Sequence, residues 1–114
     1  VDFISAHATG TKMGDVIEAQ ATGSIYGKGP SVTGLKSYMG HTMGSCGAIE
    51  AIITLYMMAE EFVPPTLNLI EVDGRCAMIR HVQHLEKKEI RIAAVQNFAF
   101  GGVNTCFILK KIGT

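Results

Sequence analysis

The sequence predicts an α/β fold in which helices alternate with the strands of a mixed β-sheet. Three observations support this prediction. Residues 1–6 are mostly β-branched or apolar, as in a buried strand, and a helical pattern, a second strand and a second helical pattern follow in turn. The chain then closes with two strand-like segments separated by Gly101 and Gly102. Alternation of this kind favours parallel strands, and a closing hairpin adds an antiparallel one.

The first helix is predicted from Asp15 to Tyr26. Asp15 and Glu18 have the spacing of a capping box, and the sequence GKGP stops the pattern after Tyr26. Apolar residues recur every four positions along this segment at Ile17, Ala21 and Ile25. We expect that apolar row to be the packed side of the helix.

A second strand is predicted over residues 32–37, with Gly34 inside it, and a second helix begins at Gly44. That helix is apolar on nearly every side, so we expect it to be buried on most of its surface and to end at Pro64 and Pro65. Its strongest periodic positions are Ile49, Ile52, Ile53 and Tyr56.

The remaining segments are shorter. Residues 76–80 predict a short edge strand, and residues 86–89, with the sequence EKKE, predict a solvated turn. Residues 91–98 and 103–112 predict the two strands of the hairpin.

Composition excludes several classes of function. The 114 residues hold ten basic and ten acidic side chains, so there is no basic surface for nucleic acid or anionic lipid. The longest apolar run, about residues 51–59, is far below the roughly 20 residues that span a membrane. Three scattered cysteines, with no CxxC or HxxxH pattern, predict no metal site and a reducing, cytoplasmic compartment. Because the chain begins at Val1 rather than Met, we expect it to be a piece of a longer polypeptide.

His7 and His41 are the first candidates for chemistry. Each follows a predicted strand and precedes a predicted helix, where α/β folds place their sites. Two imidazole N–H donors converging on one carbonyl oxygen would stabilise an enolate. Taken alone, a histidine in a glycine-rich loop is more often structural, and the AFGG sequence at residues 99–102 is either a simple turn or a source of backbone oxyanion donors.

The combination of four segments is more informative than any one of them. HATGTKMGDVIEAQ, GLKSYMGHTMGSCGAIEAI, PPTLNL and NFAFGGVNTCFIL occur in this order and spacing. Together they resemble the C-terminal half of the β-ketoacyl-[acyl carrier protein] synthases, over practically the whole chain. The resemblance implies a thiolase-like fold of αβαβα layers, in which residues 1–114 form a single C-terminal half-domain.

The resemblance also implies roles for individual residues. His7 and His41 match the two active-site histidines, which would hold the malonyl thioester carbonyl and stabilise the enolate. Lys36 matches the active-site lysine, and Glu18 matches an acidic residue expected to pair with it. Asp15 matches a further acidic position, although capping explains it equally well.

Four more residues are assigned by the same resemblance. Phe100 matches the phenylalanine that gates the acyl pocket, with its backbone N–H in the oxyanion hole. Thr9 and Thr11 match threonines that would contact the phosphopantetheine arm, and Gly101 lies beside the gate as a substrate-binding position.

The implied activity is acyl transfer with decarboxylative condensation in fatty acid or polyketide synthesis. The implied partners are acyl carrier protein, the N-terminal half of the same synthase and a second copy in a homodimer. No cofactor is expected, because the substrates are carried on the phosphopantetheine of the carrier protein. The nucleophilic cysteine would lie in the N-terminal half, so we expect this chain alone to be inactive.

The sequence departs from the family pattern at five positions. Ala8 and Ala99 replace usual glycines, and Gln96 and Asn97 replace a common asparagine and serine pair. Cys46 replaces a typical alanine, and we interpret it as a packing residue rather than a nucleophile. A positive φ at either alanine would strain the backbone.

Two other interpretations stay open. A chain-length-factor-like partner subunit has the fold without the catalysis, although the presence of both His7 and His41 argues against it. A purely structural half-domain would use the helix at residues 48–59 to pack against its twin.

Overall fold

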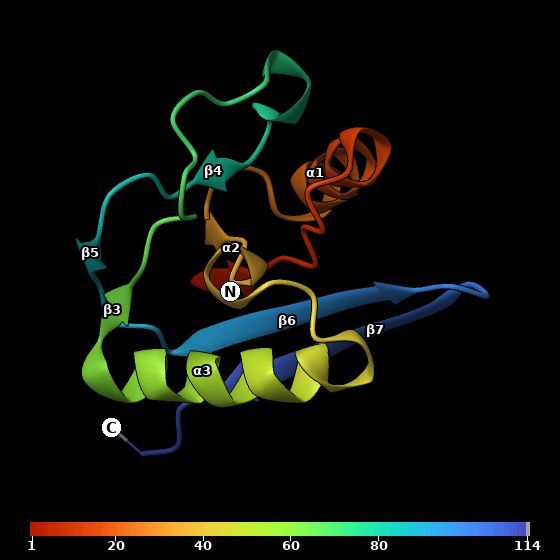
Figure 1. The fold of residues 1–114 in the computed structure, drawn as a ribbon. Coiled ribbons are helices and arrows are strands. Elements are labelled where there is room, and N and C mark those ends of the chain that lie inside the picture. The colour runs from red at the N-terminus through yellow and green to blue at the C-terminus, as the bar shows by residue number, and fades with distance from the viewer. Residues whose placement is uncertain (114) are drawn as a thin grey trace.

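The computed structural model describes residues 1–113, which fold around one five-stranded sheet (Figure 1). The strand order is β4-β2-β1-β6-β7. The first four strands in this order run parallel, and β7 is antiparallel to β6. The mixed sheet predicted from the sequence is therefore confirmed. The strands of this sheet are β1 (Phe3–Ser5), β2 (Ser31–Thr33), β4 (Arg80–His81), β6 (Ile92–Ala99) and β7 (Val103–Lys110).

Two long helices cover opposite faces of the sheet, with α1 (Lys12–Tyr26) above it and α3 (Cys46–Glu60) below it in Figure 1. Neighbouring residues of β1 alternate between the two resulting cores, because successive strand side chains point to opposite faces. Phe3 packs with Met57 of α3, and Ile4 packs with Ala19 of α1. All four side chains are buried. The layers are helix, sheet and helix.

Helix α1 ends where the sequence predicts but begins three residues earlier. Its cap is Thr11, whose Oγ1 accepts a hydrogen bond from the backbone N–H of Gly14 at 3.2 Å. Asp15 lies in the first turn, where its carboxylate accepts from the N–H of Gly10 and complements the helix dipole. The predicted capping box is therefore wrong.

The apolar row predicted to pack is instead the outer side of α1. Ile17 and Ile25 are exposed, and the buried residues of the helix are Glu18, Ala19 and Thr22. The period of the helix was correctly identified, but its inward face carries small and polar groups. A polar inward face fits a helix that borders a site rather than one that seals a core.

Strand β2 is shorter than predicted, because the chain turns after Thr33. The N–H of Gly34 donates to Thr66 Oγ1 at 3.0 Å instead of extending the strand ladder. The next residues form the short helix α2 (Lys36–Met39). Lys36 is therefore on a helix that follows the carboxyl end of β2, not on the strand.

Helix α3 follows a 3₁₀ turn, η1 (Met43–Ser45), and stops at Glu60, before the prolines. Glu61 ends it in the left-handed conformation, with φ of 57°. The helix is not buried on most sides within this chain: Ile52 and Tyr56 are exposed. Its buried residues include the polar Glu50 and Thr54.

The segment after α3 differs most from the prediction. Strand β3 (Phe62–Val63) pairs with β5 (Glu86–Lys87), so the EKKE segment is not a solvated turn. Glu86 accepts hydrogen bonds from Arg80 and Ser31, which tie β5 to the edge of the main sheet. The edge strand predicted over residues 76–80 is confirmed only at Arg80, because Cys76 lies in the 3₁₀ turn η2 (Gly74–Cys76).

The closing hairpin is confirmed, and it extends beyond the rest of the molecule in Figure 1. Gly101 and Gly102 at its tip have φ of 83° and 75°, values that favour glycine. Of the two alanines that replace family glycines, Ala8 has a positive φ of 38°, whereas Ala99 lies in strand β6. Of these two alanines, only Ala8 therefore has a strained backbone.

Candidate active site

The candidate residues meet at the carboxyl ends of β1 and β2. His7 follows β1, Lys36 begins α2 after β2, and His41 lies between α2 and η1. The imidazole rings of His7 and His41 are 5.4 Å apart between centroids and nearly perpendicular, at 87°. Both predicted histidines and the predicted lysine are thus brought together at the edge of the sheet where parallel α/β folds bind ligands.

The acidic partner of Lys36 is Glu50, not Glu18. The Nζ of Lys36 donates to both carboxylate oxygens of Glu50, at 3.0 and 3.1 Å. Both side chains are almost completely buried. The pairing predicted from the resemblance is wrong because α3, which packs against β6, brings Glu50 to Lys36. Glu18, on α1, instead binds the backbone of His7 and Ala8.

Hydrogen bonds to the Nδ1 atoms determine which imidazole nitrogen carries the proton. Lys36 Nζ lies 3.2 Å from His7 Nδ1, and an ammonium group can only donate. The backbone N–H of Met43 donates to His41 Nδ1 at 3.0 Å. Both Nδ1 atoms therefore act as acceptors, so each neutral ring carries its proton on Nε2. The site holds two Nε2–H donors.

Electrostatics keep His7 in this neutral form. Burial lowers the pKa of His7, and the positive charge of Lys36, together with that of His41 whenever His41 is protonated, lowers it further, while a contact with Asn97 acts in the opposite direction. A histidine with a lowered pKa is uncharged at neutral pH. It can therefore donate a hydrogen bond without placing a second positive charge beside Lys36.

Glu18 fixes the backbone of the histidine loop. Its two carboxylate oxygens accept from the N–H of His7 and the N–H of Ala8, both at 2.7 Å. Burial raises the pKa of Glu18, and these backbone hydrogen bonds oppose the rise. Glu18 therefore orients the loop that carries His7 and has no contact with Lys36.

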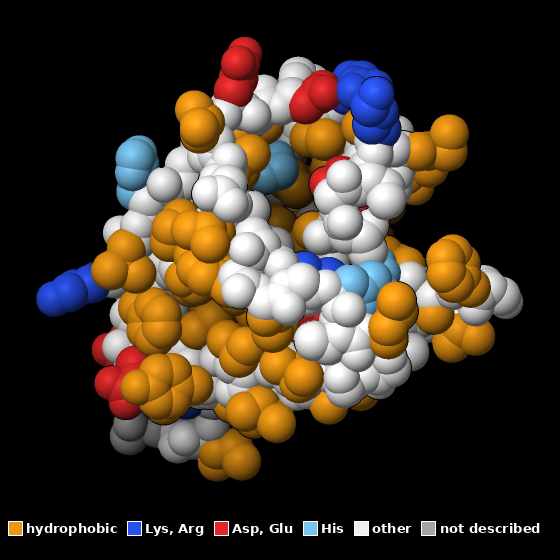
Figure 2. Space-filling view, viewed as in Figure 1, with side chains coloured by type: hydrophobic (Ala, Val, Ile, Leu, Met, Phe, Trp, Pro, Cys, Tyr) orange, Lys and Arg blue, Asp and Glu red, His pale blue; other side chains and the backbone are white. Residues whose placement is uncertain are grey.

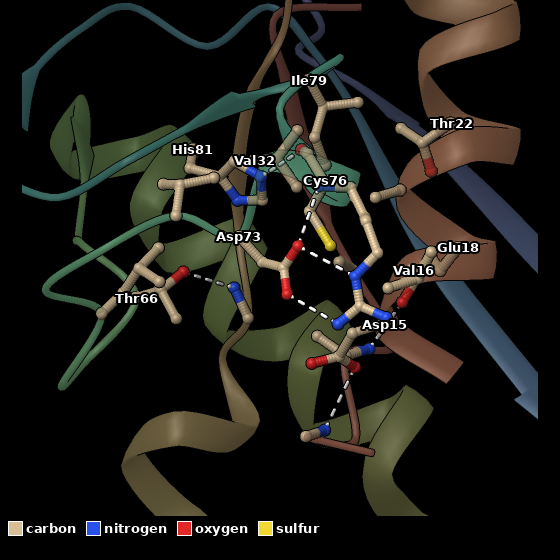
Figure 3. Close-up of a pocket in the computed structure, with 18 of the residues that line it drawn as sticks. Asp15, Val16, Glu18, Thr22, Val32, Thr66, Asp73, Cys76, Ile79 and His81 are labelled. Carbon is tan, nitrogen blue, oxygen red and sulfur yellow. Dashed lines mark hydrogen bonds and ion pairs between the residues drawn. The ribbon is translucent and has the colours of Figure 1, made fainter. Parts of the chain in front are cut away.

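Two cavities flank this loop. One, of about 320 Å³, is lined by Lys36, His41 and the segment 66–69. The other, of about 310 Å³, lies between α1 and η2, where the surface is hollowed in Figure 2. Figure 3 shows Glu18 and Thr22 of α1 on one side of this second cavity, with Asp73 on the other. Ala8 and Gly34 line both cavities and lie between them.

The predicted gate residue does not contact the histidines within this chain. Phe100 is fully exposed at the tip of the hairpin. The aromatic ring next to His7 belongs to Phe98, at 5.9 Å between centroids and nearly perpendicular. Thr9 lines the cavity of Lys36, Thr11 lines the cavity of Glu18, and Gly101 lies at the hairpin tip.

Cys46 is a buried residue next to this site. Its thiol donates to Asn97 Oδ1 at 3.4 Å, and the two residues join the start of α3 to β6. Gly47 packs closely beside them: a Cβ at that position would lie 2.9 Å from Asn97 Nδ2, so a larger residue would displace the Asn97 side chain. This environment agrees with Cys46 as a packing residue.

Sequence reasoning missed Glu50, Phe98 and the role of Gln96. Glu50 had a usable signal, because it is a lone charge in the middle of an otherwise apolar helical segment. Such a charge needs a buried partner. Gln96 donates to Glu18 at 3.1 Å, a contact across 78 positions that no local pattern indicates.

Residues 1–113 contain neither a candidate metal site nor a helix that could span a membrane. No group of three or more His, Cys, Asp or Glu side chains there is arranged to hold a metal ion. No helix in the same range has the length and apolar character needed to cross a membrane.

Comparison with known proteins identifies the family to which this chain is similar. The family model described as "Beta-ketoacyl synthase, C-terminal domain" matches residues 1–70. The chain is 32% identical over 113 residues to 3-oxoacyl-[acyl-carrier-protein] synthase 1 of Escherichia coli (strain K12), covering 98% of this chain and 28% of that protein. It matches the crystal structure of a β-ketoacyl synthase from Burkholderia phymatum STM815 with a TM-score of 0.95 and 41% identity, covering 99% of this chain and 28% of that one.

A third similar structure contains a carrier protein. It is that of a type II PKS acyl-carrier protein in complex with its ketosynthase bound to the hexaketide, with a TM-score of 0.92 and 25% identity over 99% of this chain and 28% of that one. The fold is that of the thiolase-like ketosynthases. The chain belongs to the β-ketoacyl synthase family, as its C-terminal domain. It spans about 28% of the length of these relatives.

Proposed function

We propose that this chain is the enolate-forming part of a condensing enzyme that extends an acyl thioester with a malonyl unit held on acyl carrier protein. The observation that carries the proposal is the pair of histidines whose Nδ1 atoms are both occupied as acceptors. Two Nε2–H groups that converge on one thioester carbonyl oxygen stabilise negative charge on that oxygen. This is the charge that develops when a malonyl thioester loses carbon dioxide.

The proposed reaction has two stages, decarboxylation of the malonyl unit and condensation with the acyl group. The bond between the malonyl α-carbon and its carboxylate breaks, carbon dioxide leaves, and the electron pair moves through the α-carbon to the thioester oxygen. The oxygen is then an enolate held by His7 and His41. The enolate carbon attacks the acyl thioester on a cysteine of the N-terminal half, and the cysteine leaves as a thiolate.

Lys36 supports this reaction without contacting the substrate carbonyl. Its ammonium group donates to His7 Nδ1, which keeps the proton of that ring on Nε2. Glu50 holds the ammonium group in place from the opposite side. In this proposal, Glu18 orients the histidine loop, and Phe100 closes the acyl pocket only when the N-terminal half is present.

The remaining expectations belong to the same proposal. Thr9 and Thr11 contact the phosphopantetheine arm, Gly101 belongs to the substrate-binding turn, and no separate cofactor takes part. The enzyme is a cytoplasmic homodimer, and its N-terminal half supplies the nucleophile. The carrier protein named in the E. coli relative and present in the ketosynthase complex supports the choice of partner.

The test is a comparison of His41→Ala with the wild-type full-length protein. We expect the variant to lose malonyl decarboxylation while an acyl group still transfers to the upstream cysteine, since His41 acts on the second substrate. His84→Ala is the matched control, because His84 is exposed and outside both cavities. Loss of acyl transfer with normal decarboxylation would refute this division of roles.

Mass spectrometry of the same protein separates the alternatives. An acyl adduct upstream of Val1, with a product two carbons longer, supports the condensing enzyme. Decarboxylation without any adduct favours the partner subunit. An adduct on Cys46, Cys76 or Cys106 would mean that the nucleophile lies in this chain.

A further inference from the structure

A buried polar chain runs from β6 through α1 to the backbone of His7. The side-chain nitrogen of Gln96 donates to Glu18 Oε2 at 3.1 Å and lies 3.2 Å from Thr22 Oγ1. Gln96, Glu18 and Thr22 are 7%, 7% and 4% exposed. Glu18 then accepts the backbone N–H groups of His7 and Ala8. The end of this chain is therefore the loop that aims the His7 imidazole.

Three N–H donors meet at one carboxylate, and this arrangement suits only the ionised form of Glu18. An ionised carboxylate accepts at both oxygens, whereas a protonated one turns an oxygen into a donor. That donor would face the N–H of His7, Ala8 or Gln96. Burial works against the charge, so the hydrogen bonds are what keep Glu18 ionised. Gln96 is the one donor of the three that is not part of the loop itself.

We propose that Gln96 is a positioning residue of the site, which holds Glu18 ionised and oriented so that the carboxylate fixes the backbone of His7 and Ala8. The effect on catalysis through His7 rests on the proposed function, whereas the contacts of Gln96 and Glu18 are independent of that proposal. Gln96 acts on His7 through Glu18 and touches no substrate.

Other charged and titratable groups surround Glu18, and their contribution has to be separated from that of Gln96. Asp15, on the same helix, raises the pKa of Glu18. Across the second cavity, Asp73, which caps η2, forms an ion pair with Arg75 at 2.7 Å, and the two charges largely offset one another. One further titratable group near Glu18 is His7, whose backbone N–H donates to the Glu18 carboxylate. The others line the second cavity and are Lys12, Glu71, Cys76 and His81.

The test replaces Gln96 in the full-length protein. Gln96→Leu removes the donor, so we expect amide hydrogen exchange at His7 and Ala8 to become about tenfold faster, the effect of weakening one buried hydrogen-bond network. Protonation of either His7 or Glu18 would stop the reaction, so both groups shape the acidic limb of the pH–rate profile of malonyl decarboxylation. We expect that limb to move to higher pH by up to about one unit, because Glu18 then protonates more readily. A loss of fold alone would lower the rate without moving the limb.

Three further variants complete the test. Gln96→Glu keeps the side-chain shape but adds a second carboxyl group, so the limb should move at least as far. Gln96→Asn shortens the reach by one methylene and should give an intermediate shift, which serves if the leucine variant does not fold. Thr22→Val is the matched control, because it removes the other neighbour of Gln96 while leaving Glu18 bonded, and the limb should stay in place.

The outcomes are distinct. Wild-type exchange rates and an unmoved acidic limb in Gln96→Leu would overturn the role of Gln96. Absence of decarboxylation in the wild-type protein would overturn the proposed function instead, and the exchange rates would still decide the role of Gln96. Faster exchange in Thr22→Val equal to that in Gln96→Leu would also contradict the proposal, since it would show general loosening of α1.

Discussion

The ammonium group of Lys36 joins a buried carboxylate to an imidazole, with Glu50 on one side and His7 on the other. The distances from Nζ are 3.0 Å to Glu50 Oε2 and 3.2 Å to His7 Nδ1. One cation thus balances the only charge on the buried face of α3 and sets the tautomer of a catalytic candidate. Stability and chemistry depend on the same side chain.

Removal of one partner of this pair is expected to destabilise the fold. Glu50→Leu leaves the Lys36 ammonium group buried without a counter-charge, and breaking a buried pair in this way costs about 3–5 kcal/mol. The measurement is the urea-unfolding midpoint of the full-length protein. The double variant Glu50→Leu with Lys36→Met should recover most of the loss, because no isolated charge remains. A double variant as unstable as the single one would contradict this account.

The pH dependence of His7 is expected to change when Lys36 is replaced. The pKa of His7 is lowered by burial and then by the charge of Lys36, so Lys36→Met should raise it. Since the neutral ring is the active form in our proposal, activity is present above the pKa and is lost as the pH falls through it. The acidic limb of decarboxylation should therefore move to higher pH in Lys36→Met.

The control for that experiment is Lys12→Met, which removes a positive charge from the surface of α1. Its acidic limb should match the wild type. A limb that moves to lower pH in Lys36→Met would show that the lysine does not act on His7 through its charge.

Ala8 provides a test of backbone strain. Its φ of 38° lies in the left-handed region, which costs a residue with a Cβ roughly 1–2 kcal/mol. Glycine removes that cost but loses about 0.4–1 kcal/mol through greater freedom in the unfolded chain. We expect Ala8→Gly to stabilise the protein by about 0.5 kcal/mol, seen as a higher melting temperature.

Ala99→Gly is the matched control for this prediction, because Ala99 lies in strand β6 and is not at positive φ. It should destabilise the protein, as glycine does within strands. If both substitutions lower the melting temperature equally, the conformation of Ala8 is not strained.

The sequence predicted the elements whose signals are local. The buried strand predicted at residues 1–6 and the glycine turn of the hairpin both depend on neighbouring residues, and both are confirmed. The start of α1 was misplaced because two cap signals compete, and Thr11 rather than Asp15 precedes the first turn. The histidine pair was found through the order of its motifs.

The errors arise where distant segments meet. Lys36 was assigned to Glu18, but the position of α3 beneath the sheet decides that Glu50 lies closer. Likewise, β5 forms only because Phe62 and Val63 arrive beside residues 86–87. Helical period identifies the rows of α1 and α3, but which row is buried depends on what the rest of the protein places against it.

The last prediction concerns the exposed row of α3. Ile52, Leu55 and Tyr56 are 66%, 51% and 62% exposed, and Figure 2 shows hydrophobic side chains gathered over this helix. Contiguous apolar surface of this kind is normally covered by another protein surface. We expect the 114-residue chain alone to self-associate at micromolar concentration, as measured by light scattering.

Substitutions on the helix test whether α3 is the contact. Ile52→Lys places a charge in the middle of the exposed row and should shift the chain toward the monomer. Gln20→Lys adds the same charge at an exposed polar position of α1, on the opposite face of the sheet, and should leave the self-association unchanged. A clean monomer in the unmodified chain would refute the prediction. Equal effects of the two lysines would show that net charge, rather than the apolar row of α3, controls the association.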